Sequence, residues 1–342
     1  MKIICLSSYW PAVGGGEAHY GKLCEILSVK NEVELIYNGC DFISENEKKF
    51  NLDLSRCKKT KLEQGKFSEY SKNADLFISY NHHIEVFPRG ARNILFCTIP
   101  FFKYPNMSAY NSIIANSNFT ADFLRTKFSN VEVLCPHIDK EYTNCKNKKN
   151  LILTVGRFNQ DLHCKKQYEL VREFKNASID FREFMDWKFA VAGVAKFNSE
   201  IALYNKCKEL AKHNQRIEVL ENISFEEIIK LNSEAKLYWH GTGYGEVAPK
   251  KMEHFGMAVV NAMASGCVPL VVNRGEPQNL VGYADQIWSD WDDLINKTRW
   301  WISHPVELTR RASEMIAKSR KYSEEAFVSS VKRIFSKLGV SF

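Results

Sequence analysis

Residues 236–282 read KLYWHGTGYGEVAPKKMEHFGMAVVNAMASGCVPLVVNRGEPQNLVG. The short apolar run at 237–239 ends in a glycine-rich turn, a pattern typical of a buried strand that leads into a loop. Apolar residues then recur at helical spacing from Met257 to Met263, and Gly266 is a suitable stop for that helix. Residues 268–272 form a second apolar run of strand length. The stretch therefore predicts one strand, loop, helix and strand of an α/β fold.

The expected helix start offers an anion-binding site, and a carboxylate stands beside it. The first N–H groups of a helix lack partners within the helix and carry the positive end of its dipole. Gly256, Met257 and Ala258 at this start are therefore expected to contact phosphate. The neighbouring carboxylate, Glu253, is better suited to accept hydrogen bonds from sugar hydroxyls than to touch phosphate.

This part of the chain resembles glycosyltransferase family 4, the retaining sugar transferases with the GT-B fold. From Glu253 it reads E-H-F-G-x-x-x-V-x-A-M-A-S-G-C-V-P, which is similar to the E-x7-E signature of that family. Upstream, Trp239, His240, Gly243 and Gly245 match the W-H-x-x-G-x-G motif of one branch. The resemblance implies an α/β fold of two Rossmann-like, doubly wound domains facing across a cleft. It also implies that His240 belongs to the donor site and that Glu253 holds the donor sugar.

Three positions depart from the family pattern. Asn261 stands where the second signature glutamate grips the ribose hydroxyls, and Asn279 stands where relatives usually have a third glutamate. Thr98 replaces a histidine that touches the donor sugar near the reaction centre. An amide keeps one acceptor oxygen but loses the strength of a charge-assisted hydrogen bond. We therefore expect nucleotide binding to be weaker than in relatives.

Imidazole and aromatic side chains flank the Thr98 segment. His82 and His83 follow the preceding expected strand and are alternatives to the missing histidine, although loop histidines are more often simply solvated. An aromatic lip that meets the acceptor is expected from Phe101, Phe102 and Tyr104.

Residues 155–167, VGRFNQDLHCKKQ, begin at the end of an expected strand. Arg157 offers a planar fork for phosphate, and Lys165 or Lys166 offers a point charge. Alone, these cations are more typical of a solvated surface. The segment resembles the family motif V-G-R-F-x(n)-H-x-K-K-Q, in which an arginine and a lysine neutralise the leaving nucleotide diphosphate. The resemblance assigns that role to Arg157 and to Lys166 in preference to Lys165.

Three consecutive glycines, 14–16, follow the first expected strand and open a helix. Glycine lets the backbone approach a diphosphate closely, although such a loop is also compatible with a simple turn. The segment resembles the family stretch P-x-x-G-G-x-E at Pro11, Gly15 and Gly16. The resemblance implies that the Gly15 and Gly16 amides face the donor diphosphate.

Two short motifs suggest other chemistry and are rejected on the sequence. Residues 16–22 have the G-x4-G-K spacing of a P-loop, but Leu23 replaces the hydroxyl residue that must hold magnesium. Asp290 and Asp292 have the D-x-D spacing of metal-dependent sugar transferases. They follow Ser289 and precede Leu294, which indicates a capped helix start. We expect no metal site.

A chain of 342 residues is long enough for two domains. Strands expected at 2–6, 32–37, 75–80, 93–97, 112–116 and 131–134, with helices at 17–29 and 119–128, predict a parallel sheet. The pattern restarts after a charged linker at 138–150. The expected domains are an acceptor-side domain at 1–145, a donor-side domain at 146–322 and a final helix at 323–342 that crosses back to the first domain.

Composition narrows the class of protein. Hydrophobic residues make up 45% and charged residues 25%, as in ordinary globular chains. The net charge of +7 is scattered, so no concentrated basic face for nucleic acid is expected. The ten cysteines include no C-x-x-C and read as free thiols, and no run is long enough to span a membrane. These features predict a cytoplasmic protein.

The leading hypothesis is a metal-independent hexosyltransferase with no bound cofactor. It would move sugar from a UDP- or GDP-sugar to a hydroxyl acceptor, either a glycan or a lipid-linked molecule, and peripheral contact with the inner face of a membrane is compatible with it. A GT-B-like protein that binds a nucleotide sugar or a partner without turnover is the main alternative. A GT-B epimerase or phosphorylase is a further one.

Overall fold

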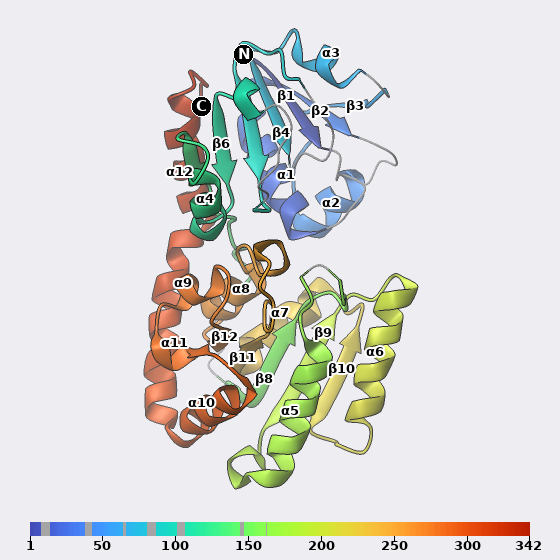
Figure 1. Ribbon diagram of the computed structural model, residues 1–342, viewed down its shortest axis with the longest axis vertical. Coiled ribbons are helices and arrows are strands. Elements are labelled where there is room, and N and C mark those ends of the chain that lie inside the picture. Colours follow the sequence, from blue (N-terminus) through green and yellow to red (C-terminus); the bar gives the residue numbers. More distant parts are fainter. Residues whose placement is uncertain are drawn as a thin grey trace. The chain divides into compact units, whose positions relative to one another are not determined.

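The computed structural model describes residues 1–7, 14–37, 43–63, 66–80, 87–100, 107–143, 147–161 and 163–342. These residues form two compact units. Unit 1 contains Met1–His137 and Glu324–Phe342, and unit 2 contains Ile138–Ser323. Each unit is a parallel β-sheet with helices packed against it (Figure 1).

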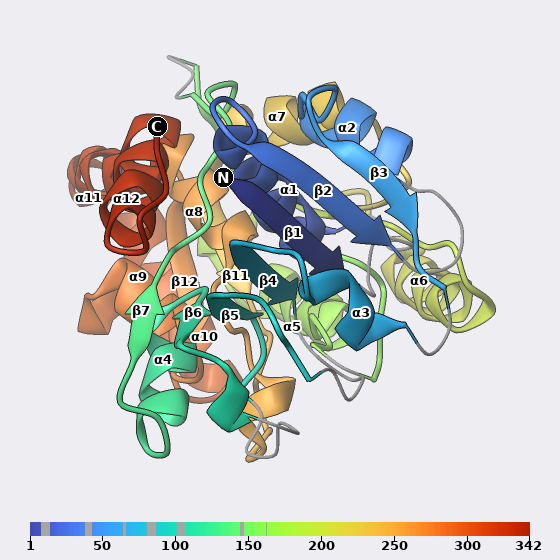
Figure 2. The same cartoon turned by 90° about the horizontal axis from the view of Figure 1, so that it is seen from above.

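Unit 1 contains a 7-stranded sheet in the order β3-β2-β1-β4-β5-β6-β7, visible from above in Figure 2. All of its strand pairs are parallel. The strands are β1 (Lys2–Ser7), β2 (Glu32–Tyr37), β3 (Lys58–Lys61), β4 (Leu76–Tyr80), β5 (Asn93–Cys97), β6 (Ser112–Ala115) and β7 (Val131–Val133). The helices are α1 (Gly15–Leu27), α2 (Ile43–Phe50), α3 (Phe67–Ser71), η1 (Met107–Ala109), α4 (Asn118–Arg125) and α12 (Glu324–Ser336).

The last helix of the chain is part of the core of unit 1. On one face of α12, Phe327, Val331, Ile334 and Phe335 are buried, and they belong to the same hydrophobic cluster as residues of α1, β1, β4 and β5. At the exposed side, Arg333 and Lys337 pair with Glu132 of β7. The amphipathic pattern of this helix is thus explained by its burial against the first sheet rather than the second.

Unit 2 contains a 6-stranded parallel sheet in the order β10-β9-β8-β11-β12-β13. The strands are β8 (Lys149–Val155), β9 (Lys188–Gly193), β10 (Ile217–Glu221), β11 (Ala235–His240), β12 (Val268–Val272) and β13 (Ile287–Trp288). The α-helices are α5 (Gln167–Asp180), α6 (Asn198–Ala211), α7 (Phe225–Glu234), α8 (Met257–Ala264), α9 (Pro277–Val281), α10 (Trp291–Ser303) and α11 (Pro305–Ser319). Single-turn helices are η2 (Arg182–Phe184), η3 (Pro249–Lys251), η4 (Ala284–Gln286) and η5 (Arg320–Tyr322).

The segment read as a linker, residues 138–150, is integrated into unit 2. The Ile138 N–H donates to the carbonyl oxygen of Tyr322 at 2.8 Å. Lys148 Nζ donates to the carbonyl oxygens of Ala235 at 2.7 Å and Ser265 at 2.5 Å. The boundary therefore falls after His137 rather than after residue 145, because the Ile138 N–H and the Lys148 amine both satisfy backbone acceptors of unit 2.

Three further features of the described chain relate to the sequence expectations. The described cysteines, eight in number, are free thiols, whereas Cys40 and Cys145 lie outside the described residues. No helix in the described ranges is long and apolar enough to cross a membrane. Ser117 caps α4 by accepting from the Thr120 N–H at 3.1 Å, as expected for a helix N-cap.

His19 lies in the core of unit 1 with 1% of its surface exposed. Its ring packs edge-on against Phe96 and Phe327, with centroid distances of 4.9 and 5.5 Å. Neither ring nitrogen has a hydrogen-bond partner among the described residues. Burial, with a smaller contribution from the charge of His137, lowers the pKa of His19 to about 3. His19 is therefore neutral in the folded protein.

A buried neutral histidine makes stability depend on pH. Because its pKa is about 3 when folded and about 6.5 when unfolded, its contribution is complete above pH 6.5. The contribution is lost as pH falls toward the folded value, at about 1.4 kcal/mol per pH unit. We expect His19→Phe to reduce the loss of unfolding free energy between about pH 6.5 and 4.5 by about 2 to 3 kcal/mol.

Urea unfolding across this pH range measures the effect, with the fluorescence of the whole protein as the signal. His213→Asn is the matched control because His213 is exposed, and asparagine tolerates its positive φ of 69°. An acid profile of His19→Phe that coincides with the wild-type profile would show that His19 is not a source of acid sensitivity.

Candidate functional site

Glu253 is the centre of a charged cluster in unit 2. It follows η3, and its carboxylate accepts a hydrogen bond from Lys165 Nζ at 2.5 Å. His240 Nε2, at the end of β11, lies 3.5 Å from the same carboxylate oxygen. Burial alone would raise the pKa of the Glu253 carboxyl, but the Lys165 charge and His240 hold the pKa well below its usual range. The sequence prediction thus named three side chains that the fold brings together.

Glycines hold the backbone around Glu253. Gly275 has a φ of +72°, and a Cβ there would collide with the Glu253 carbonyl oxygen. That oxygen instead accepts a hydrogen bond from the Glu276 N–H at 3.0 Å. Gly256 has a φ of +105° and is the N-cap of α8. Both glycines occupy the left-handed region that side chains disfavour, so the path of the chain on either side of Glu253 requires them.

The adjacent lysines Lys165 and Lys166 have different carboxylate partners. Lys165 crosses over Gly156, where an added Cβ would stand only 2.7 Å from its Cγ, and reaches Glu253. Lys166 is the N-cap of α5 in a left-handed conformation with φ 57°, and its Nζ lies 3.4 Å from Glu246 Oε1. The left-handed turn separates the two side chains, so each amine serves its own carboxylate.

Gln167 fixes the turn that carries Arg157. Its side chain is buried, and its Nε2 donates to the carbonyl oxygens of Gly156 at 3.1 Å and Arg157 at 2.9 Å. The Arg157 side chain itself is 59% exposed, with Nε 4.0 Å from Glu200 Oε1. Gln167 is a positioning residue that the sequence analysis quoted without assigning a role. The sequence signal that could have identified Gln167 was its position directly after two lysines in a strand–loop–helix segment.

Two further imidazoles line the Glu253 cluster. The rings of His163 and His254 meet edge to face with centroids 4.4 Å apart, and His254 Nε2 is 3.2 Å from the Pro249 carbonyl oxygen. Burial lowers the pKa of His254 to about 3 and also lowers the pKa of His163. Both rings are therefore neutral near pH 7. The sequence analysis quoted both histidines within family motifs but assigned neither a role.

Helix α8 begins beside Glu253 without a side-chain cap. Met257 and Ala258 form its first turn, as the sequence predicted. Asn261 lies one turn further on, and its Oδ1 is buried without a partner among the described residues. The Asn261 amide lies beside the Tyr142 hydroxyl, whose pKa is raised by burial and lowered in part by this amide. Asn261 thus offers a buried acceptor that a ligand hydroxyl could use.

The predicted residues of unit 1 gather around Tyr80. Gly15 and Gly16 are the first residues of α1, and a Cβ on Gly16 would collide with the Tyr80 hydroxyl. The Thr98 side chain, just after β5, is a hydrogen-bond partner of Tyr80 and offsets part of the rise in the tyrosine pKa caused by burial. Packing against Tyr80 therefore explains the glycine at 16 without a ligand. Tyr80, the last residue of a buried strand, was missed.

Two rejected motifs have structural explanations. Gly21 and Lys22 lie inside α1, where Lys22 pairs with Glu25 and Glu324, so the P-loop spacing makes no phosphate loop. The cap of α10 is Asp290, whose carboxylate accepts from the Asp293 N–H at 2.9 Å. Several predicted residues lie outside the described ranges and stay predictions: Pro11, His82, His83, Phe101, Phe102 and Tyr104.

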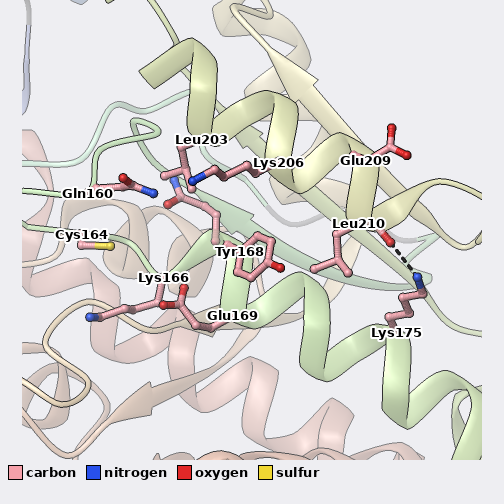
Figure 3. Close-up of a pocket in the computed structure, with 11 residues that line it drawn as sticks. Gln160, Cys164, Lys166, Tyr168, Glu169, Lys175, Leu203, Lys206, Glu209 and Leu210 are labelled. Atoms are coloured by element: carbon pink, nitrogen blue, oxygen red, sulfur yellow. Dashed lines mark hydrogen bonds between the residues drawn. The ribbon is translucent and has the colours of Figure 1, made fainter. Parts of the chain in front are cut away.

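A separate groove of about 790 Å³ lies between α5 and α6 (Figure 3). Tyr168, Leu203 and Leu210 line it, and Lys175 at one end donates to the Leu210 carbonyl oxygen at 3.0 Å. The groove includes Lys166, but Figure 3 shows that this side chain points away from Tyr168 and Leu210. Glu253, Lys165 and His240 are not part of its lining. It is therefore distinct from the charged cluster.

Comparisons with known proteins agree on the fold. No curated protein matches the sequence. The Anabaena protein Alr3699/HepE, solved in complex with UDP and glucose, matches with a TM-score of 0.73 at 15% identity, covering 100% of both chains. A sucrose-phosphate synthase from Thermosynechococcus elongatus matches with a TM-score of 0.73 at 14% identity, covering 99% of both. A glycosyltransferase from Rickettsia africae matches with a TM-score of 0.74 at 14% identity, covering 100% of this chain and 99% of the other.

The family model described as glycosyl transferases group 1 matches residues 137–322, which is more than half of the chain and nearly all of unit 2. The matched residues include Glu253, Lys165, Lys166 and the start of α8. The α/β fold of two parallel-sheet domains is the one found in the solved GT-B glycosyltransferases. This chain therefore belongs to the glycosyl transferases group 1 family.

Proposed function

We propose that the protein is a retaining hexosyltransferase of family 4 that transfers sugar from a UDP- or GDP-sugar to a hydroxyl acceptor without a metal. One observation carries the proposal: the buried, ionised Glu253 lies between Lys165, His240 and the uncapped start of α8. An ionised carboxylate accepts hydrogen bonds from sugar hydroxyls, while the cations and helix start suit a diphosphate.

The leaving group is neutralised by fixed positive groups in this proposal. Arg157 and Lys166, with Lys165 and the first turn of α8 at Gly256–Ala258, would face the diphosphate. Fixed donors aimed at developing charge are commonly the largest contribution to catalysis, so such a site needs no metal. Solved complexes of Alr3699/HepE contain UDP and UDP-glucose, which favours a uridine donor.

The acceptor is proposed to be a glycan or lipid-linked hydroxyl, with the protein in the cytoplasm and in peripheral contact with a membrane.

The second candidate function is that of a protein that binds a nucleotide sugar without turnover. This candidate is favoured by three substitutions relative to the family pattern, because each replaces a group that forms a stronger hydrogen bond: Thr98, Asn261 and Asn279. Retention of Glu253 with its cationic partner argues for the enzyme, because a binding remnant does not require that buried ion pair.

The first test is calorimetric binding of UDP-, GDP-, ADP- and TDP-sugars, followed by donor hydrolysis and product analysis. We expect one UDP- or GDP-sugar to bind without added metal and to be hydrolysed slowly. Arg157→Ala should weaken binding of that donor about tenfold or more, since a charge-assisted contact to phosphate is lost. Arg172→Ala, on the exposed face of α5, is the matched control. Absence of binding by every donor would contradict the proposed function.

Glu253→Gln separates the enzyme from the binding protein. The amide keeps the shape of the side chain but leaves Lys165 without its counter-ion and holds the sugar hydroxyls less strongly. We expect at least a hundredfold loss of kcat on the donor, comparable to removal of one electrostatic contact in an active site, with nucleotide binding retained. Unchanged turnover would remove Glu253 from the mechanism.

Asn261→Glu tests the weakened ribose contact. The Asn261 Oδ1 is a buried acceptor with no partner in the described chain, so a carboxylate there would accept the same hydroxyls with charge-assisted strength. We expect the Kd for UDP or GDP to fall about threefold to tenfold. Asn279→Glu is the comparison variant, because Asn279 of α9 donates to Glu276, the N-cap residue of that helix, and a second carboxylate there introduces repulsion. If Asn261→Glu bound nucleotide no more tightly, Asn261 would not be the ribose contact.

A further inference from the structure

A loop of unit 2 carries a carboxylate for which the proposed reaction has no role. The loop joins β11 to Glu253 and has two anchors: Tyr244 packs on Trp291 at 4.3 Å between ring centroids, and the Pro249 carbonyl oxygen is 3.2 Å from His254. Between these anchors the chain is open. Val247 is 91% exposed, and nothing lies within 4 Å of where a Cβ on Gly245 would stand.

Glu246 lies in this open part and joins two lysines. Its Oε1 is 3.4 Å from Lys166 Nζ, and its Oε2 is 3.4 Å from Lys251 Nζ. The Lys166 and Glu246 side chains are only 16% and 22% exposed, whereas that of Lys251 is 44% exposed. The carboxylate thus has one amine at each oxygen, in the way that a phosphate group would.

We propose that Glu246 is an internal competitor of the donor diphosphate and weakens the binding of every phosphate ligand at Lys166 and Lys251. A ligand that binds these amines must either displace the Glu246 carboxylate or bind beside its negative charge. Because this cost applies to every ligand, a diphosphate with further contacts, as in a nucleoside diphosphate or its sugar, still binds tightly, whereas a nucleoside monophosphate or inorganic phosphate binds weakly. This inference rests on the proposed function, because it assigns the diphosphate to Lys166.

The competition follows from charge and tethering. A carboxylate on the same chain is present at a high effective concentration, so an incoming anion gains only the difference between its contacts and those of Glu246. A single phosphate exchanges one anion for another on the same lysines and gains little. A diphosphate has a second phosphoryl group for Lys165, Arg157 or the start of α8, and so gains contacts that the carboxylate does not make.

The loop geometry permits the exchange. Gly243 and Gly245 have φ values of +98° and +73°, backbone conformations that side chains disfavour, so the turn before Glu246 is built on glycine. The open space beside Gly245 leaves room for the Glu246 side chain to rotate outward, while Tyr244 stays packed on Trp288 and Trp291. Glu253, by contrast, is fixed by Gly275 and by the hydrogen bond to its carbonyl oxygen. Glu246 is therefore the carboxylate that can yield.

Glu246→Gln tests the inference with ligands that do not depend on the sugar. Calorimetry would compare inorganic pyrophosphate, inorganic phosphate, UDP and UMP at low and moderate salt. We expect the variant to bind all four ligands about threefold to tenfold more tightly than the wild type, because each ligand is released from the same competition with the carboxylate. Its affinity should also fall more steeply with salt, because each bound anion now forms ion pairs without breaking one.

Glu234→Gln is the matched control, since it also removes one ion pair of unit 2, that of Glu234 with Lys149 at 2.8 Å, at the opposite end of β8. A Glu246→Gln variant with wild-type affinities and salt dependence for all four ligands would overturn the inference while leaving the proposed function intact. Wild-type protein that binds neither UDP, GDP nor pyrophosphate would instead contradict the proposed function itself.

Discussion

The ion pair between Lys165 and Glu253 is the interaction on which the rest of the site depends. It joins the loop between β8 and α5 to the loop before α8, two segments 88 residues apart in the sequence. Two mostly buried charges are costly unless they are paired and further hydrogen-bonded. The surrounding chain meets this requirement with small residues at Gly156 and Gly275, which leave room for the lysine and for the Glu253 backbone. Both glycines therefore leave the space in which the two charged residues meet.

Parallel sheets explain why these groups meet. The carboxyl ends of β8, β11 and β12 lie along one edge of the sheet, and each is followed by a loop that carries site residues. Tyr238 of β11 reinforces this edge, because its hydroxyl donates to the Val155 carbonyl oxygen at 3.2 Å at the end of β8. In unit 1 the same rule places Tyr80 at the end of β4 and Thr98 after β5. The strands fix where each loop begins, and the loops supply the chemistry.

The sequence predicted most of the strands and helices that are apolar runs, but few of the ion pairs between side chains. Strands such as β5 and β12 appear at the expected residues because they are mainly apolar runs with clear breaks. The edge strand β3, KKTK, was not among the expected strands, since an exposed edge strand has no apolar pattern and is protected from aggregation by its lysines. Individual site residues were predicted, but their ion-pair partners were not. The pairing of Lys165 with Glu253, and of Lys166 with Glu246, depends on a left-handed turn at Lys166 that no spacing rule reveals.

The protonation states in unit 2 bear on where the acceptor proton goes in the proposed transfer. Glu253 has a pKa well below its usual range, so it is a weak base near pH 7 and suits hydrogen-bond acceptance better than proton abstraction. Burial also lowers the pKa values of His240, His163 and His254, which makes each imidazole a weaker base than a solvated one. The described groups nearest Glu253 thus suit the binding of a donor and the neutralisation of its charge better than the removal of a proton. This favours a reaction in which the departing phosphate, stabilised by fixed cations, accepts the proton of the attacking hydroxyl.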